Sequence, residues 1–278
     1  MKRRAFLGAI GSTVTVSVGA YAYATRDPLD RLAVRVWFSE QAATYDGVRA
    51  RIREYLERFL DRDLPYWSLE LSFGGVVPVS IEDGAHVTAR GEWPLRLAGG
   101  LVDASDLDPV ADVNLLVTDG DMIEAPTGYG LPHVASVGGA KHIAALEPLE
   151  ELLAIATREG TWDEDGPDDE RSIVPLTTRA RTMQVLLHEI GHAVGLDHDH
   201  GVAFRSGSAV VATPMLSTYA FSSSYDGDRS ACGSVYPETA GRDRGISLSF
   251  SDCARQRLEE YAGGVVPRLD SCCSRLPE

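Results

Sequence analysis

One segment dictates more of the fold than any other in this 278-residue chain. His188 and His192 are four residues apart, so on a helix their side chains project from the same face. Glu189 lies about 100° round that helix from His188. The helix must then end, because His198 can return to the same point only after a reversal, and Gly195 allows the left-handed conformation that ends helices. The segment predicts a helix, a tight turn and three converging histidines.

Three neutral imidazoles are typical ligands of Zn²⁺ and leave a fourth position for water, which is the catalytic arrangement. Such an ion lowers the pKa of the water and polarises a carbonyl, while Glu189 is placed to accept the proton and deliver it to a leaving amine. By chance the pattern H-E-x-x-H-x-x-G-x-x-H appears in roughly one chain in 10⁵. Two alternatives to a catalytic zinc site remain. Ordinary core histidines are the weaker one, and a chain that binds zinc without catalysis is the stronger one.

These residues resemble the zinc signature of the metzincin peptidases, and Asp199, directly after the third histidine, is similar to the adamalysin (reprolysin) branch. The resemblance implies an exported zinc endopeptidase with a methionine turn beneath the metal. Met215 is the candidate for that turn, and a buried filler methionine is the alternative. Tyr219, four residues later, and Asp199 are assigned supporting roles near the oxyanion.

The resemblance also implies the fold: α/β, with a twisted, mixed but mostly parallel sheet, two long helices and a small C-terminal subdomain that ends in a helix near 251–262. It divides the chain into 30–200, with the active-site helix at 178–195, and 201–278. A polypeptide substrate is expected to lie extended along an edge strand near Gly130–Gly138, antiparallel to it. Matrixins bind a second, structural zinc through further histidines. His133 and His142 are expected not to form such a site, because no H-x-D partner accompanies them. The protein is expected to be a monomer.

Hydrophobic periodicity predicts the remaining elements. Helical spacing indicates helices at 45–60 and at 178–194, the second capped by Thr178. Strands are predicted at 32–38, 68–73, 76–81, 86–90, 113–118, 130–137 and 142–146.

Residues 1–24 are predicted to be a signal peptide, because a basic start precedes an apolar stretch and small residues that suit cleavage after Ala24. Arg3 and Arg4 resemble a twin-arginine signal, which implies an extracellular or cell-surface location. An uncleaved N-terminal anchor is the alternative, and no membrane span is expected after cleavage. Only some ten residues separate this signal from the first predicted strand, so we expect no inhibitory pro-segment.

The four cysteines agree with export, since an even number in an exported protein suggests disulfides. Cys272 and Cys273 are adjacent and would be strained if bonded to each other. One is therefore expected to pair with Cys232 and the other with Cys253, with the choice left open. A four-cysteine zinc site is the alternative, which no C-x-x-C spacing supports.

The charge balance limits the partners. Asp and Glu number 41 against 26 Lys and Arg, which gives a net charge of −15, and only Lys2 and Lys141 are lysines. A protein with this net charge attracts neither nucleic acid nor an anionic membrane. It resembles proteins of salt-loving archaea, with a GC-rich genome as the alternative reason for the scarcity of lysine. The acidic stretch 163–170 is predicted to be a solvated loop, and Ca²⁺ binding there is the alternative.

Three functions are therefore compatible with the sequence. The leading hypothesis is a zinc endopeptidase. The alternatives are a catalytically silent zinc-binding or adhesion module and a hydrolase of a non-protein amide of the cell envelope.

Overall fold

The structure, a computed structural model, describes residues 29–123, 127–158, 172–222, 232 and 239–263. The predicted signal peptide and the acidic stretch 163–170 lie outside these residues, so the predictions made for them stay predictions, and Cys272 and Cys273 also lie outside. Among the residues described, no helix is long and apolar enough to cross a membrane.

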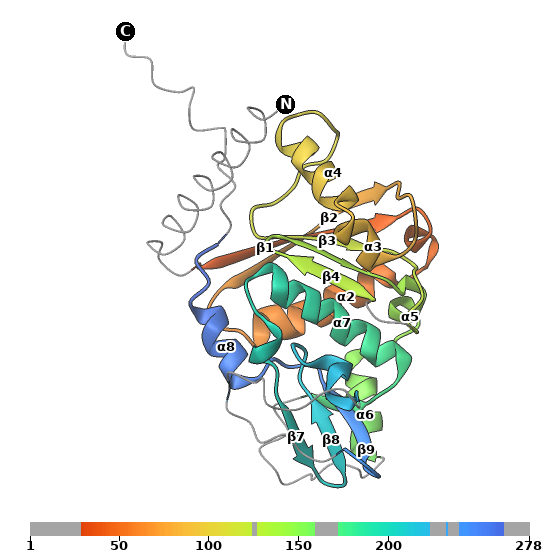
Figure 1. Cartoon of the computed structure of the whole chain (residues 1–278), viewed down its shortest axis with the longest axis vertical. Helices are drawn as coiled ribbons and strands as arrows, with labels where there is room; N and C mark the ends of the chain where they lie inside the picture. Colours follow the sequence, from red (N-terminus) through yellow and green to blue (C-terminus); the bar gives the residue numbers. More distant parts are fainter. Residues whose placement is uncertain (1–28, 124–126, 159–171, 223–231, 233–238, 264–278) are drawn as a thin grey trace, which may run out of the picture.

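The larger of two sheets is mixed and mostly parallel, as predicted, with the strand order β2-β1-β3-β5-β4 (Figure 1). Only β4 runs antiparallel to its neighbour. The central strand β3 is buried at every position, which suits its continuous apolar sequence. The strands are β1 (Arg31–Ser39), β2 (Ser68–Val77), β3 (Val113–Val117), β4 (Gly128–Leu131) and β5 (Val134–Val137).

Helices cover both faces of this sheet, and the alternation of side chains along the strands decides what they cover. Val36 of β1 and Leu115 of β3 point into the main core, whereas Trp37 and Leu116 point to the other face. Helices α2 (Val48–Leu56), α5 (Ala140–Ala144) and α7 (Thr178–Ala193) pack in the main core, and α3 (Gly84–Ala89) and α4 (Glu92–Leu101) cover the other face.

A smaller sheet, with the order β6-β9-β8-β7, lies beyond α7, at the bottom of Figure 1. Strand β6 precedes α7 in the chain and the other three follow it, so this sheet is built from both sides of the helix. Its strands are β6 (Ile173–Pro175), β7 (Ala203–Ser206), β8 (Ala209–Ala212) and β9 (Asp243–Ser247), and the helices beside it are α6 (Leu149–Arg158) and α8 (Asp252–Glu259). The predicted C-terminal helix is thus confirmed as α8.

Two segments predicted as strands are helical. Residues 86–90 fall in α3, whose first turn is capped by Asp83: the Asp83 carboxylate accepts a hydrogen bond from the His86 amide at 3.0 Å. Residues 142–146 overlap α5, which starts after Gly139 in the left-handed region, at φ 76°. Segments of five residues are too short to show a period, so local capping decides their structure.

Other predicted bounds also shift. Strand β2 continues across a bulge at Gly74 to Val77, and 78–81 is not a strand. The strand predicted at 130–137 is the hairpin β4–β5, with His133 at its turn. The helix predicted at 45–60 is α2 followed by a π-helical segment, Glu57–Arg62.

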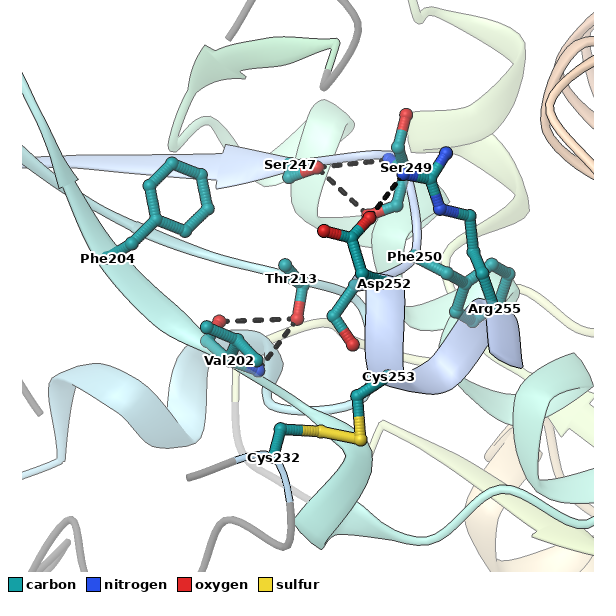
Figure 2. Close-up of a pocket in the computed structure, with 11 residues that line it drawn as sticks. Val202, Phe204, Thr213, Cys232, Ser247, Ser249, Phe250, Asp252, Cys253 and Arg255 are labelled. Carbon is teal, nitrogen blue, oxygen red and sulfur yellow. Dashed lines mark hydrogen bonds and ion pairs between the residues drawn. A yellow bond between two sulfur atoms is a disulfide. The ribbon is translucent and has the colours of Figure 1, made fainter. Parts of the chain in front are cut away.

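The predicted cysteine pairing is wrong: Cys232 and Cys253 are bonded to each other, with Cα atoms 5.7 Å apart (Figure 2). Cys253 lies in the first turn of α8, so the bond ties the segment at 232 to that helix. Sequence spacing carries no information on which cysteines the fold brings together. The disulfide borders a pocket of about 360 Å³ that is also lined by Thr213 and Ser247 and by no histidine among the described residues.

Candidate metal centre and its cleft

Helix α7 positions the first two histidines and Glu189. The helix starts at Thr178, but its cap is Thr177 and not Thr178 as predicted: the Thr177 hydroxyl oxygen accepts a hydrogen bond from the Ala180 amide at 3.1 Å. Its apolar residues, including Met183 and Leu187, are fully buried in the main core. The position of the helix is therefore fixed by packing along most of its length.

The end of α7 brings back the third histidine, as predicted. Gly195 has φ 90°, and the Leu196 amide donates to the Gly191 carbonyl at 2.9 Å, which closes the helix end. The chain then enters a short 3-10 turn, His198–His200. This reversal places His198 opposite His188 and His192.

The three imidazoles converge through their Nε2 atoms. The Nε2–Nε2 distances are 3.0 Å from His188 to His192, 3.1 Å from His192 to His198 and 3.3 Å from His198 to His188. In a tetrahedral zinc site with Zn–N of about 2.0–2.1 Å, two ligand nitrogens lie about 3.3 Å apart. The triangle therefore has the size that a single zinc ion requires.

The outer nitrogens of two of the rings fix their tautomers. His188 Nδ1 is 2.7 Å from the Pro214 carbonyl oxygen, and His192 Nδ1 is 2.8 Å from that of Leu196. A carbonyl oxygen only accepts, so both Nδ1 atoms donate and each Nε2 presents a lone pair in the neutral ring. Two lone pairs 3.0 Å apart repel each other unless a cation lies between them. The donor set thus fits a metal ion.

Burial keeps the rings in the form that binds metal. Burial, and then the charge of His192, lowers the pKa of His188 to about 3. Burial also lowers the pKa values of His192 and His198. All three rings are therefore neutral at neutral pH.

Glu189 lies beside this triangle and is 5% exposed. Burial raises the pKa of its carboxyl to about 8. Strand β4 packs directly against it: a β-carbon at Gly128 would lie 2.7 Å from Glu189 Oε1, and one at Gly130 would lie 2.5 Å from His192 Cβ. The two glycines let the edge strand approach α7 more closely than any other residue would.

Met215 is buried against α7. It is 1% exposed, and its Sδ would be 2.4 Å from a β-carbon at Gly191, so this helical glycine makes room for the sulfur. The preceding Pro214 supplies the carbonyl that holds His188. Met215 and its neighbour therefore support the first histidine from below.

The other predicted residues differ in their distance from the triangle. The Tyr219 ring is half-exposed and its centroid lies 5.1 Å from that of His198. Asp199 instead faces His200, with 3.2 Å between Asp199 Oδ1 and His200 Nδ1. His133, whose Nδ1 contacts the Asp112 carbonyl at 3.1 Å, and His142 join no cluster of three ligand groups among the described residues.

A second cluster, which the sequence analysis did not single out, consists of Asp197, Asp199 and His200. The His200 Nδ1 atom accepts a hydrogen bond from the Asp197 amide at 3.0 Å. This hydrogen bond closes the turn after α7. The cluster thus has a structural explanation.

A cleft of about 250 Å³ opens beside the triangle. Its walls are the start of β4, one face of α7 and the 3-10 turn Ser217–Phe221. Besides Glu189 and Tyr219 it is lined by Arg181 and Ser217, which the sequence analysis missed. Arg181 could have been found, because it lies eight residues before Glu189, on the same side of the helix.

Comparison with known proteins adds little. No protein-family model matches the sequence, and no curated protein matches it. Among solved structures, archaemetzincin from Methanopyrus kandleri is similar, with a TM-score of 0.37 and 15% identity over 84% of this chain and 96% of that one. At that level of similarity nothing about the site follows.

Proposed function

We propose that this protein is a zinc-dependent peptidase of the metzincin kind, with His188, His192 and His198 as the metal ligands. One observation carries the proposal: three Nε2 atoms lie within 3.0–3.3 Å of one another, and two of the rings are held by carbonyls in the tautomer that binds metal. Zinc bound there would lower the pKa of a water and polarise the scissile carbonyl.

Glu189 is the residue that moves protons in this proposal. Its carboxylate accepts a proton from the attacking water and returns it to the nitrogen of the leaving amine. Burial raises the pKa of this carboxyl in the metal-free protein, and the charge of a bound zinc ion would lower it again, so that the carboxylate can accept the proton. Tyr219, beside His198, supplies a hydroxyl toward the oxygen of the scissile carbonyl.

Strand β4 is the proposed binding surface for the substrate. It is the last strand of its sheet, and Tyr129 and Leu131 point outward while Gly128 and Gly130, which alternate with them, face α7. An extended peptide can add to this edge as a further antiparallel strand, bound by backbone hydrogen bonds. This mode holds the peptide across the front of the histidine triangle.

The test compares casein hydrolysis and zinc content in wild type and Glu189→Gln, from low to molar salt. We expect one zinc per chain in both proteins, activity in wild type that a chelator abolishes, and a loss of about 10²–10⁴-fold in the variant. Bound zinc without turnover at any salt would favour the silent module or a non-protein amide. Absence of zinc would overturn the proposal.

Export is a separate proposal that rests on the sequence of residues 1–24. Replacing Arg3 and Arg4 together by Lys is expected to retain the protein inside the cell, because the twin-arginine route reads that pair. Immunoblots of cell and medium fractions measure the effect, and unchanged secretion would contradict it.

A further inference from the structure

The cleft beside Glu189 lies where the part of the substrate after the scissile bond would pass. Thr127 and Gly128, at the beginning of β4, form one wall of the cleft. A peptide antiparallel to β4 runs toward the beginning of that strand as it proceeds to its own C-terminus. The cleft therefore receives the first side chain after the scissile bond.

A cation that forms no ion pair with any described residue lines this cleft. Arg181 is half-buried, and its Nη1 donates to the Met122 carbonyl at 2.8 Å. Its Nε is buried and has no hydrogen-bond partner among the described residues, and the guanidinium forms no ion pair with them. A guanidinium has five N–H donors, and Met122 is the one hydrogen-bond acceptor for Arg181 that the described residues supply.

Ser217 adds a second buried donor to the same cleft. The residue is 4% exposed, and its Oγ has no hydrogen-bond partner among the described residues. Its backbone has φ 50°, a left-handed conformation that is rare for a residue other than glycine, asparagine or aspartate. A buried hydroxyl left without a partner in a strained turn is costly, which indicates that a ligand completes it.

We propose that Arg181 and Ser217 form a carboxylate-binding subsite, so that the protein prefers substrates with an acidic group directly after the scissile bond. The inference rests on the proposed peptidase function. Guanidinium and hydroxyl donors together match the two oxygens of a carboxylate. Among the described residues lining the cleft, Glu189 is the only acid, and it is kept for proton transfer.

Two kinds of carboxylate suit this subsite: the side chain of an internal glutamate or aspartate, and the terminal carboxylate of a substrate. Arg181 and Glu189 are eight residues apart, or about 12 Å along the helix axis. The subsite is therefore deep. We expect glutamate to be preferred to aspartate, because its side chain is longer by one methylene group and reaches further into the cleft.

The first test measures binding without turnover. Two hydroxamates, which chelate zinc, differ only in carrying a glutamate or a glutamine side chain at the position next to the chelating group. Calorimetry on the zinc-loaded protein is expected to show about 10–100-fold tighter binding of the glutamate compound, as for a charge-assisted hydrogen bond. Arg181→Gln should remove that ratio and Arg181→Lys should restore part of it.

Arg179→Gln is the matched control, because it makes the same change of charge two residues away on α7. Arg179 pairs instead with Glu147 at 2.8 Å and does not line the cleft. It should keep the full preference. Equal binding of the two hydroxamates to wild type, or a preference that survives in Arg181→Gln, would overturn the subsite.

The second test identifies the source of the carboxylate. A degenerate peptide library, with free or amidated C-termini, is digested and the cleaved bonds are read by mass spectrometry. Enrichment of glutamate after the cleaved bond in both libraries indicates an internal side chain, whereas cleavage one residue from the end that amidation abolishes indicates the terminus. Turnover with neither pattern would refute the subsite and leave the peptidase, while a hydroxamate preference without any turnover would refute the peptidase and leave the subsite.

Discussion

At the scale of single residues, the close approach of Gly128 to Glu189 fixes the position of the carboxylate to which we assign proton transfer. Gly128→Ala would place a β-carbon 2.7 Å from Glu189 Oε1, so the carboxylate must move. A displacement of about 1 Å can lower kcat/KM by about 10²-fold, and we expect a loss of that order with zinc content unchanged. Peptide hydrolysis and metal analysis on the same preparation provide the measurement.

Gly99→Ala is the control for this change. Gly99 lies within α4, and its nearest neighbour to an added β-carbon would be Ser105 Oγ at 3.4 Å. Alanine should raise the stability of the helix slightly and leave activity intact. If Gly128→Ala were as active as Gly99→Ala, strand β4 would not set the position of Glu189.

Glu189 is also expected to destabilise the metal-stripped protein above pH 4.5. The pKa of its carboxyl is raised to about 8, so between pH 4.5 and 8 the folded state holds a proton that the unfolded state has released. Stability therefore falls as the pH rises through this window. In Glu189→Gln this fall is absent. From pH 4.5 to pH 8, the free energy of unfolding of the variant should therefore rise relative to that of wild type by on the order of 4 kcal/mol.

Urea unfolding of both proteins in chelator, from pH 4 to pH 9, measures this difference. His188 titrates in both proteins and lowers their stability alike as the pH falls from about 6.5 toward 3, because its pKa is depressed in the folded state. The difference between the two curves therefore isolates Glu189. Parallel curves from pH 5 to pH 8 would contradict the assignment.

At the scale of elements, the sequence predicted those parts of the fold that have a clear apolar pattern or contain a rare motif. Strand β3 is a short apolar segment that is buried at every position, and helix α7 has apolar residues at helical spacing over 16 residues. Segments 86–90 and 142–146 were misread because their helical state depends on Asp83 and Gly139, which lie outside the apolar runs themselves. The histidine spacing predicted the triangle because all three residues lie within one local reversal.

The cleft could not be predicted in the same way. Its walls come from the start of β4, one face of α7 and the turn that contains Ser217. No periodicity relates these segments, since only the tertiary fold brings them together. The strained φ of Ser217 and the buried Nε of Arg181 are properties of packing.

Helix α7 is joined to the smaller sheet by one buried side chain. Gln184 Nε2 donates to the carbonyls of Ala212 and Ser247, both at 2.8 Å. Gln184→Leu removes both hydrogen bonds in a fully buried setting, and we expect the free energy of unfolding to fall by about 2–3 kcal/mol. Chemical denaturation of the zinc-free protein measures it.

Thr182→Val is the matched control, because Thr182 is equally buried and its hydroxyl bonds only within the helix, to the Thr178 carbonyl at 2.8 Å. We expect a change below about 1 kcal/mol. Equal losses in the two variants would mean that Gln184 does not hold the helix to the sheet.

At the scale of the whole molecule, the net charge of −15 opposes the preference that Arg181 creates. A negative body repels an acidic peptide at distances beyond the cleft, and this repulsion slows association. The Debye length falls from about 10 Å at 0.1 M salt to about 3 Å at 1 M, so the repulsion is screened while contacts inside the cleft are screened much less. Salt should therefore weaken the long-range repulsion much more than the contact between the substrate carboxylate and Arg181.

We expect kcat/KM for an acidic peptide to rise from low salt to 2 M KCl, and that for a basic peptide of the same length to fall. The ratio between glutamate and glutamine after the scissile bond should stay well above one at 2 M KCl in wild type and lie near one in Arg181→Gln. A wild-type ratio that fell to one at 2 M KCl would assign the preference to long-range charge. A ratio that persisted would place it in a direct contact with the half-buried guanidinium, because only contact distances escape the screening.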